Sequence, residues 1–98
     1  MNTISPEFTT KLEKITSLSK KITTNDTSTI LTMIHDHVKE ISERYNNNND
    51  DHWSIETADV IILCYELLLM EHKDIDDVFD RCLPRFDTKL KRLADHVP

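Results

Sequence analysis

The stretch K-E-I-S-E-R-Y-N-N-N-N-D-D-H-W-S-I-E-T-A-D-V, residues 39–60, decides the fold because it carries two matched pairs of acidic residues on either side of a turn. Glu40 and Glu43 precede the turn, and Glu56 and Asp59 follow it. Residues spaced three apart lie on one face of a helix. The asparagines and aspartates between the pairs disfavour helix interiors and tolerate turns. The stretch therefore predicts two antiparallel helices joined by a short connection over residues 46–51.

This hairpin would gather all four carboxylates in one small volume, with Glu43 near Glu56 and Glu40 near Asp59. Carboxylates that close repel one another unless they are protonated or a cation neutralises them. Sites built from oxygen ligands alone suit hard divalent ions, magnesium above all. We therefore expect a Mg²⁺ site and chemistry on a phosphorylated substrate. The competing interpretation is that both pairs belong to solvated helix faces, because 18 of the 98 residues are acidic.

The rest of the chain predicts an all-α fold, a single four-helix bundle-like domain over residues 1–98. Apolar residues recur at helical spacing, and capping residues mark the helix starts. These starts are expected at Ser5-Pro6, at Thr27 or Thr29, near Ser54, and after Lys73-Asp74. The apolar stripe of the first helix is expected at Phe8, Leu12, Ile15, Leu18 and Ile22, and that of the second at Ile30, Ile34, Val38, Ile41 and Tyr45. Pro84 should kink or restart the fourth helix.

The third helix is apolar on almost every side, with Glu56, Asp59 and Glu66 as its main polar positions. A helix of this kind must be covered all round, and three partner helices in one small domain are too few. The sequence therefore predicts an obligate homo-oligomer, a dimer or a tetramer. Glu66 is expected to be an added metal ligand, a base, or the partner of an arginine on the fourth helix.

Composition narrows the partners and the way in which phosphate can be bound. The formal net charge of −6 argues against binding to nucleic-acid polymers or to an anionic membrane. No apolar run approaches the roughly 20 residues of a membrane span, and the N-terminus does not resemble a signal peptide. Cys64 and Cys82 lack metal-binding spacing and are expected to be reduced core residues of a cytoplasmic protein. Because the chain contains no glycine, metal ions and basic side chains, not a glycine-rich loop, must hold phosphate.

Together these motifs resemble the signature of the MazG-like all-α nucleotide pyrophosphohydrolases, over roughly residues 28–92. The run Glu40-x-x-Glu43 is followed by Glu56-x-x-Asp59, as in that signature. Other matching segments are Ala58-Asp59-Val60-Ile61, similar to A-D-V-L; Asp74-Ile75-Asp76, similar to G-I-D; and Arg85-Phe86-Asp87-Thr88-Lys89-Leu90, similar to K-F-x-x-R-F.

The resemblance implies hydrolysis of a nucleoside triphosphate, with a deoxynucleoside triphosphate as the favoured substrate, to the monophosphate and pyrophosphate, as house-cleaning of the nucleotide pool. It implies Mg²⁺ bound by Glu40, Glu43, Glu56 and Asp59. A carboxylate that is not fully committed to the metal, Glu43 or Glu40, is expected to accept the proton of the attacking water. Basic residues of the fourth helix would contact the substrate's phosphates, namely Arg85, Lys89 and Arg81.

The chain departs from the family pattern in three places. Leu83 replaces the usual asparagine, Lys39 replaces the first glutamate of the E-E-x-x-E run, and the glycines are absent. These differences leave the substrate open, with deoxyuridine triphosphate or phosphoribosyl-ATP as narrower choices. They also leave open a non-catalytic helical module that senses nucleotides or binds proteins. The histidines are expected to be ordinary exposed or loop residues, and Trp53 a packing residue.

Overall fold

The computed structural model describes residues 5–22, 26–47 and 50–97 of the chain. Its helices are α1 (Pro6–Lys20), α2 (Thr27–Asn47), α3 (His52–Met70) and α4 (Ile75–Ala94), and the described ranges contain no strand. The all-α prediction is confirmed, and each helix begins close to the predicted residue. Asn48 and Asn49 of the predicted connection lie outside the described residues.

Three of the helices begin at a residue whose side chain caps the exposed backbone amides. Ser5, Asp26 and Asp74 each accept a hydrogen bond from the amide three residues further on, at 3.2, 2.8 and 3.0 Å. Caps of this kind satisfy donors that have no partner within the helix. The bonds from the backbone and the side chain of Thr29 lower the pKa of the Asp26 carboxyl.

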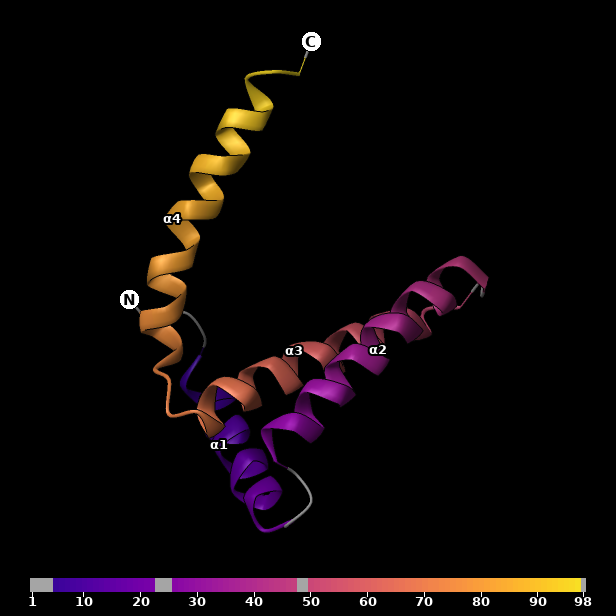
Figure 1. The fold of residues 1–98 in the computed structure, drawn as a ribbon, viewed down its shortest axis with the longest axis vertical. Helices are drawn as coiled ribbons and strands as arrows, with labels where there is room; N and C mark the ends of the chain where they lie inside the picture. The colour runs from indigo at the N-terminus through magenta and orange to yellow at the C-terminus, as the bar shows by residue number, and fades with distance from the viewer. Residues whose placement is uncertain (1–4, 23–25, 48–49, 98) are drawn as a thin grey trace.

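α3 is the central helix, because it packs against each of the other three. Its most extensive contact is with α2, and the two lie side by side as an antiparallel hairpin (Figure 1). Near the turn the rings of Tyr45 and Trp53 meet edge to face, with centroids 5.4 Å apart. At the other end of α3, the ring of Tyr65 contacts the rings of Phe8 in α1 and Phe79 in α4, with centroids 5.9 and 6.0 Å away. The aromatic pair and cluster therefore fix both ends of the central helix.

The apolar core of one chain is small. Among the described residues, the buried apolar side chains are Leu12, Ile30 and Ile75, and only Leu12 and Ile30 are fully buried. The predicted stripe of α1 is only partly right, because Leu18 is 63% exposed and Ile22 is 52% exposed. The buried face of α1 instead runs through Leu12, Thr16 and Ser19, which are spaced three and four apart and therefore share one side of the helix.

α4 extends away from the other helices (Figure 1). Among the described elements it packs only against α3, and its buried residue, Ile75, is at its start. The chain turns between α3 and α4 at His72, whose φ is 58°. The radius of gyration is 16.2 Å, whereas a compact domain of this length has about 13 Å. The four helices therefore do not close into a bundle within one chain.

Two local predictions need correction. α4 continues as one helix through Pro84, so the predicted restart is wrong. Pro84 is exposed, and water can therefore hydrate the carbonyl group that loses its helical partner there. Cys64 is exposed and Cys82 half-buried, so neither is a core residue of the single chain. Among the described residues, no helix has both the length and the apolarity that crossing a membrane requires.

Candidate functional site

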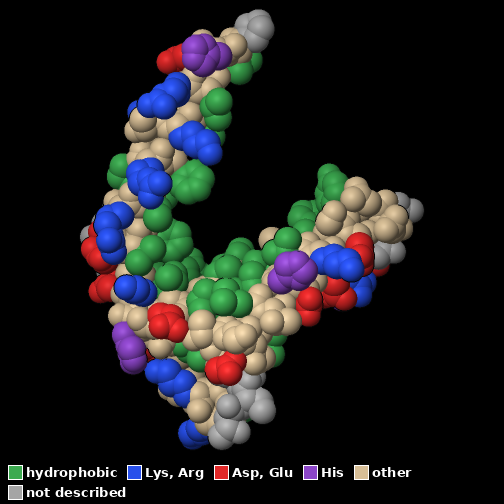
Figure 2. All heavy atoms as spheres, in the orientation of Figure 1, with side chains coloured by type: hydrophobic (Ala, Val, Ile, Leu, Met, Phe, Trp, Pro, Cys, Tyr) green, Lys and Arg blue, Asp and Glu red, His purple; other side chains and the backbone are tan. Residues whose placement is uncertain are grey.

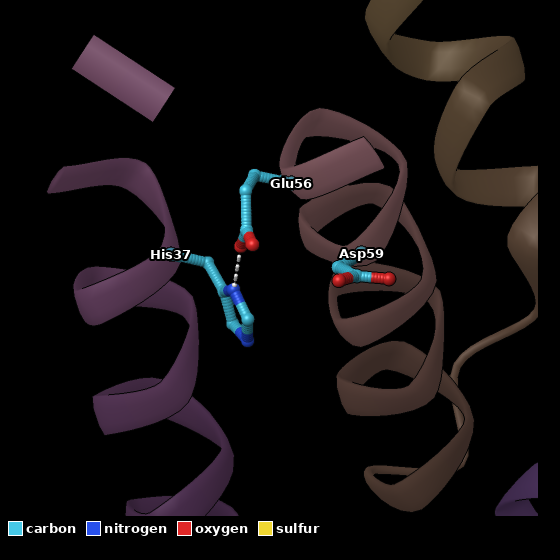
Figure 3. A group of neighbouring side chains, drawn as sticks. All are labelled: His37, Glu56 and Asp59. Atoms are coloured by element: carbon cyan, nitrogen blue, oxygen red, sulfur yellow. Dashed lines mark hydrogen bonds and ion pairs between the residues drawn. The ribbon is translucent and has the colours of Figure 1, made fainter. Parts of the chain in front are cut away.

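The α2–α3 hairpin brings together His37, Glu56 and Asp59 (Figure 3). One ligand atom from each side chain lies within 4.8 Å of the other two. The Nδ1 atom of His37 lies 2.6 Å from Oε2 of Glu56, and Nε2 of His52 lies 3.4 Å from the other carboxylate oxygen. Glu56 is only 7% exposed, so an acidic group is held inside the hairpin by two histidines.

The charges of this cluster shift its pKa values in opposite directions. The hydrogen bond to Glu56 raises the pKa of His37, and the negative charges of Glu56, Asp59 and Glu40 act in the same sense against partial burial. The same hydrogen bond lowers the pKa of Glu56, assisted by hydrogen bonds with Glu40 and His52 and opposed by burial. An imidazolium and a carboxylate therefore stabilise each other across the hairpin.

Three of the four predicted acidic residues converge in this region. Glu56 and Asp59 belong to the cluster, and Glu40 lies near enough to them to influence the pKa values of Glu56 and His37. Glu43 is exposed, and it is not among the residues that surround His37 and Glu56. The hairpin therefore brings one member of the first acidic pair, Glu40, near the second pair, and His37 lies opposite Glu56 at the position predicted for Glu43.

The position of His37 follows from which side of α2 faces α3. The half-buried positions of α2 include Ile34, His37 and Ile41, whereas Val38 is 50% exposed and Tyr45 is 65% exposed. Apolar residues alone predict a stripe through Val38 and Tyr45, and this part of the predicted stripe is wrong. The available signal was spacing, because position 37 lies three residues after Ile34 and four before Ile41, on their common face.

Glu66 is buried on α3, with 5% of its surface exposed. Within the described part of the chain no hydrogen bond or ion pair is found for its carboxyl group, so the predicted pairing with an arginine of α4 is not seen. Glu66 also lies outside the His37–Glu56–Asp59 cluster. A buried carboxylate of this kind is costly unless something else neutralises it.

The predicted phosphate-binding residues lie on α4. Arg85 and Lys89, together with Arg92, border an open hollow of about 480 Å³ that Cys82 and Phe86 also line. Arg81 is instead paired with Asp77, at 2.9 Å. Every residue lining the hollow comes from α4, so one chain provides only one wall of it. Because α4 and α3 diverge from the turn at His72, the basic residues and the acidic cluster lie on separate arms of the molecule (Figure 1).

The donor set of the cluster fits a divalent cation. The carboxylates of Glu56 and Asp59 are ligands that Mg²⁺ accepts, and the imidazole nitrogen of His37 is one that Mn²⁺ and later transition metals also accept. Comparison with protein-family models, with curated proteins and with solved structures finds no match for this chain. The functional argument therefore depends on the geometry and chemistry of the chain itself.

Proposed function

We propose that this chain is a Mg²⁺-dependent nucleoside triphosphate pyrophosphohydrolase that acts as a homo-oligomer. The observation that supports the proposal is the approach of Glu40, one member of the first acidic pair, to Glu56 and Asp59 of the second pair across the α2–α3 hairpin. The unpaired basic residues of α4 support it, because a triphosphate needs positive side chains as well as metal when glycine-rich loops are absent. The MazG-like order of these motifs along the chain agrees with this assignment.

Each residue has a role in the proposed reaction. Glu56, Asp59 and Glu40 would hold Mg²⁺, with Glu43 free to approach from the exposed side of α2 and with His37 fixing the orientation of Glu56. The metal would offset the charge of the triphosphate and orient water for in-line attack. Water forms a bond to the α-phosphorus as the bond to the bridging oxygen breaks, and pyrophosphate leaves. Glu43, or Glu40, would accept the proton of that water.

The basic residues of α4 would act on the other side of the substrate. Arg85 and Lys89 would bind the phosphate oxygens and neutralise the charge that develops on the leaving pyrophosphate. Arg81 would contribute after release from Asp77, with which it forms an exposed pair. Exposed pairs of this kind contribute only about 0–1 kcal/mol, so a phosphate group can displace Asp77 at little cost.

The proposal is tested by measuring pyrophosphate release from a panel of ribonucleoside and deoxynucleoside triphosphates with Mg²⁺. Asp59→Asn and Glu43→Gln should each lower turnover by at least about 100-fold, which is the usual contribution of such groups. Asp36→Asn is the matched control, because Asp36 is an exposed acid of α2 outside the cluster. Circular dichroism should show unchanged helical content. Full activity in Asp59→Asn, or no release from any triphosphate by the wild type, would refute the assignment.

A second candidate function is a non-catalytic helical module that senses nucleotides or binds proteins. The observation that favours it is the pairing of Glu56 with His37 and His52, which neutralises the buried carboxylate without a metal. The two functions differ in their response to Mg²⁺. At ten times its Kd, a metal that binds the folded state alone stabilises it by about 1.4 kcal/mol. A melting temperature that does not change with Mg²⁺ would favour the non-catalytic module.

A further inference from the structure

The second half of α4 and the residues directly after it carry an apolar seam that nothing in the described chain covers. Its residues follow one another at intervals of three and four, the spacing of a helix that packs along its length against another helix. Their exposed fractions range from 47% to 70%. The seam consists of Leu83, Phe86, Leu90, Leu93 and Val97. Figure 2 shows apolar side chains gathered on the concave side of the molecule, between α4 and the hairpin.

The total surface of the chain also indicates a missing partner. The accessible surface is 7628 Å², whereas a compact monomer of 11.5 kDa exposes about 5,800 Å². The excess, about 1,800 Å² per chain, is larger than the roughly 800 Å² that each partner contributes to a standard interface. One stable contact between two copies can therefore account for the open shape.

The hairpin offers a complementary apolar surface. On α2, Leu31, Val38 and Tyr45 are each at least half exposed, and on α3, Ile55 and Ile61 are 56% and 47% exposed. One chain therefore presents both an uncovered seam and an uncovered hairpin. Two copies can exchange these surfaces around a two-fold axis, so that each seam covers the other chain's hairpin and the assembly closes.

Charge favours the hairpin over a second α4 as the surface that meets the seam. Beside the seam lie Arg85, Lys89 and Arg92, for which no ion pair is found among the described residues. Residues 27–71, which span the hairpin, carry nine acidic residues against two basic ones, Lys39 and Arg44. Two α4 helices packed together would bring basic residues near one another, whereas α4 on the hairpin brings opposite charges together.

We propose that the α4 seam docks on the α2–α3 hairpin of a second copy of this chain, and that this contact brings Arg85 and Lys89 to the second copy's His37–Glu56–Asp59 cluster. The role of this contact in completing the site rests on the proposed function, whereas the docking itself does not. Each site of the dimer would then combine carboxylates from one chain with basic residues from the other.

Sedimentation tests the docking without any assay of activity. The wild type should sediment at twice the 11.5 kDa of the chain. The seam variant Phe86→Glu/Leu90→Glu and the hairpin variant Ile61→Glu should both dissociate. Leu18→Glu is the matched control, because it places a charge at an exposed apolar residue of α1 and should remain dimeric. A folded monomeric wild type, or a seam variant that stays dimeric, would overturn the docking. A dimeric Ile61→Glu beside a monomeric seam variant would overturn the hairpin as the docking surface.

Complementation between inactive variants tests the shared site and does not require disruption of the interface. Asp59→Asn and Arg85→Ala/Lys89→Ala change surface charges and should each form inactive dimers. Co-expressed, they should recover about a quarter of wild-type activity, because about half of the dimers are mixed and each mixed dimer has one intact site of two. Activity no higher than that of the separate variants would overturn the shared site. An inactive wild type that sediments as the predicted dimer would refute the proposed function while supporting the docking.

Discussion

Dilution should lower the melting temperature of this protein, because the folded state that we propose is a dimer. The described part of one chain buries only Leu12, Ile30 and Ile75 among its apolar residues, and it exposes the whole α4 seam. A monomer of this shape gains little from the hydrophobic effect, which is roughly proportional to the apolar area removed from water. Most of the stability should therefore come from contact between copies, and stability then depends on protein concentration.

The size of the effect follows from chain length. A 100-fold dilution lowers the stability of a dimer by about 2.7 kcal/mol, since each tenfold change is worth about 1.4 kcal/mol. The entropy of unfolding is about 2.1 cal/mol/K per residue, so it is about 0.41 kcal/mol/K for two chains of 98 residues. The ratio of these values predicts a fall in melting temperature of about 7 °C.

Circular dichroism of the helical signal measures this shift, with melts recorded at about 1 µM and about 100 µM under reversible conditions. The seam variant Phe86→Glu/Leu90→Glu is the control, and its melting temperature should be low and independent of concentration. If the wild type melts at the same temperature across this range and sediments as a single chain, the reasoning from exposed surface to assembly is refuted.

Two further predictions concern buried charge. Without metal, the pair of His37 and Glu56 should stabilise the fold most between about pH 4.5 and 6.5. Because the pKa of His37 is raised in the folded state, its contribution to stability is lost as the pH rises above 6.5 and through the folded pKa. Because the pKa of Glu56 is lowered in the folded state, its contribution is lost as the pH falls below 4.5 and through the folded pKa. The melting temperature of His37→Gln in chelator should differ most from that of the wild type in this window, while His35→Gln, at an exposed histidine of the same helix, should follow the wild type throughout. Glu66→Leu should stabilise the protein by about 1–3 kcal/mol, because it removes a buried carboxylate for which the described chain provides no partner. A loss of stability on denaturant unfolding would instead show that the assembled protein pairs Glu66.

The helices could be predicted from the sequence because their signals are local. Ser5 followed by proline, and Asp74 followed by two further acids, mark helix starts through backbone hydrogen bonds within one turn. The hairpin was likewise predictable, since a run of asparagine and aspartate separates two long helical patterns. Each of these signals depends only on residues close to one another along the chain.

The facing sides of the helices were harder to predict, because packing between helices decides them. Apolar identity drew the stripe of α2 through Val38, whereas the half-buried face runs one position earlier, through His37. One residue is about 100° of rotation around a helix, so a stripe drawn through Val38 turns His37 away from α3. Helix spacing from Ile34 and Ile41 would have corrected this error. Glu43 was placed beside Glu56 for a different reason, namely that the two acidic pairs flank the connection, and His37 lies opposite Glu56 instead.

The direction of α4 has a similar cause, and it bears on how the proposed site would work. The spacing of its seam predicts a face that packs in a core, but no local signal specifies whether the same chain or a second chain supplies the surface that covers it. If the partner supplies it, the acidic cluster and the basic residues meet only after association. A triphosphate is repelled by residues 50–71 alone, since they carry six acidic residues and no positive charge from lysine or arginine. Arg85 and Lys89 would attract the triphosphate, but they lie on α4, which extends away from the hairpin of the same chain (Figure 1). Assembly would therefore precede substrate binding, because the complete electrostatic environment for a triphosphate exists only between two chains.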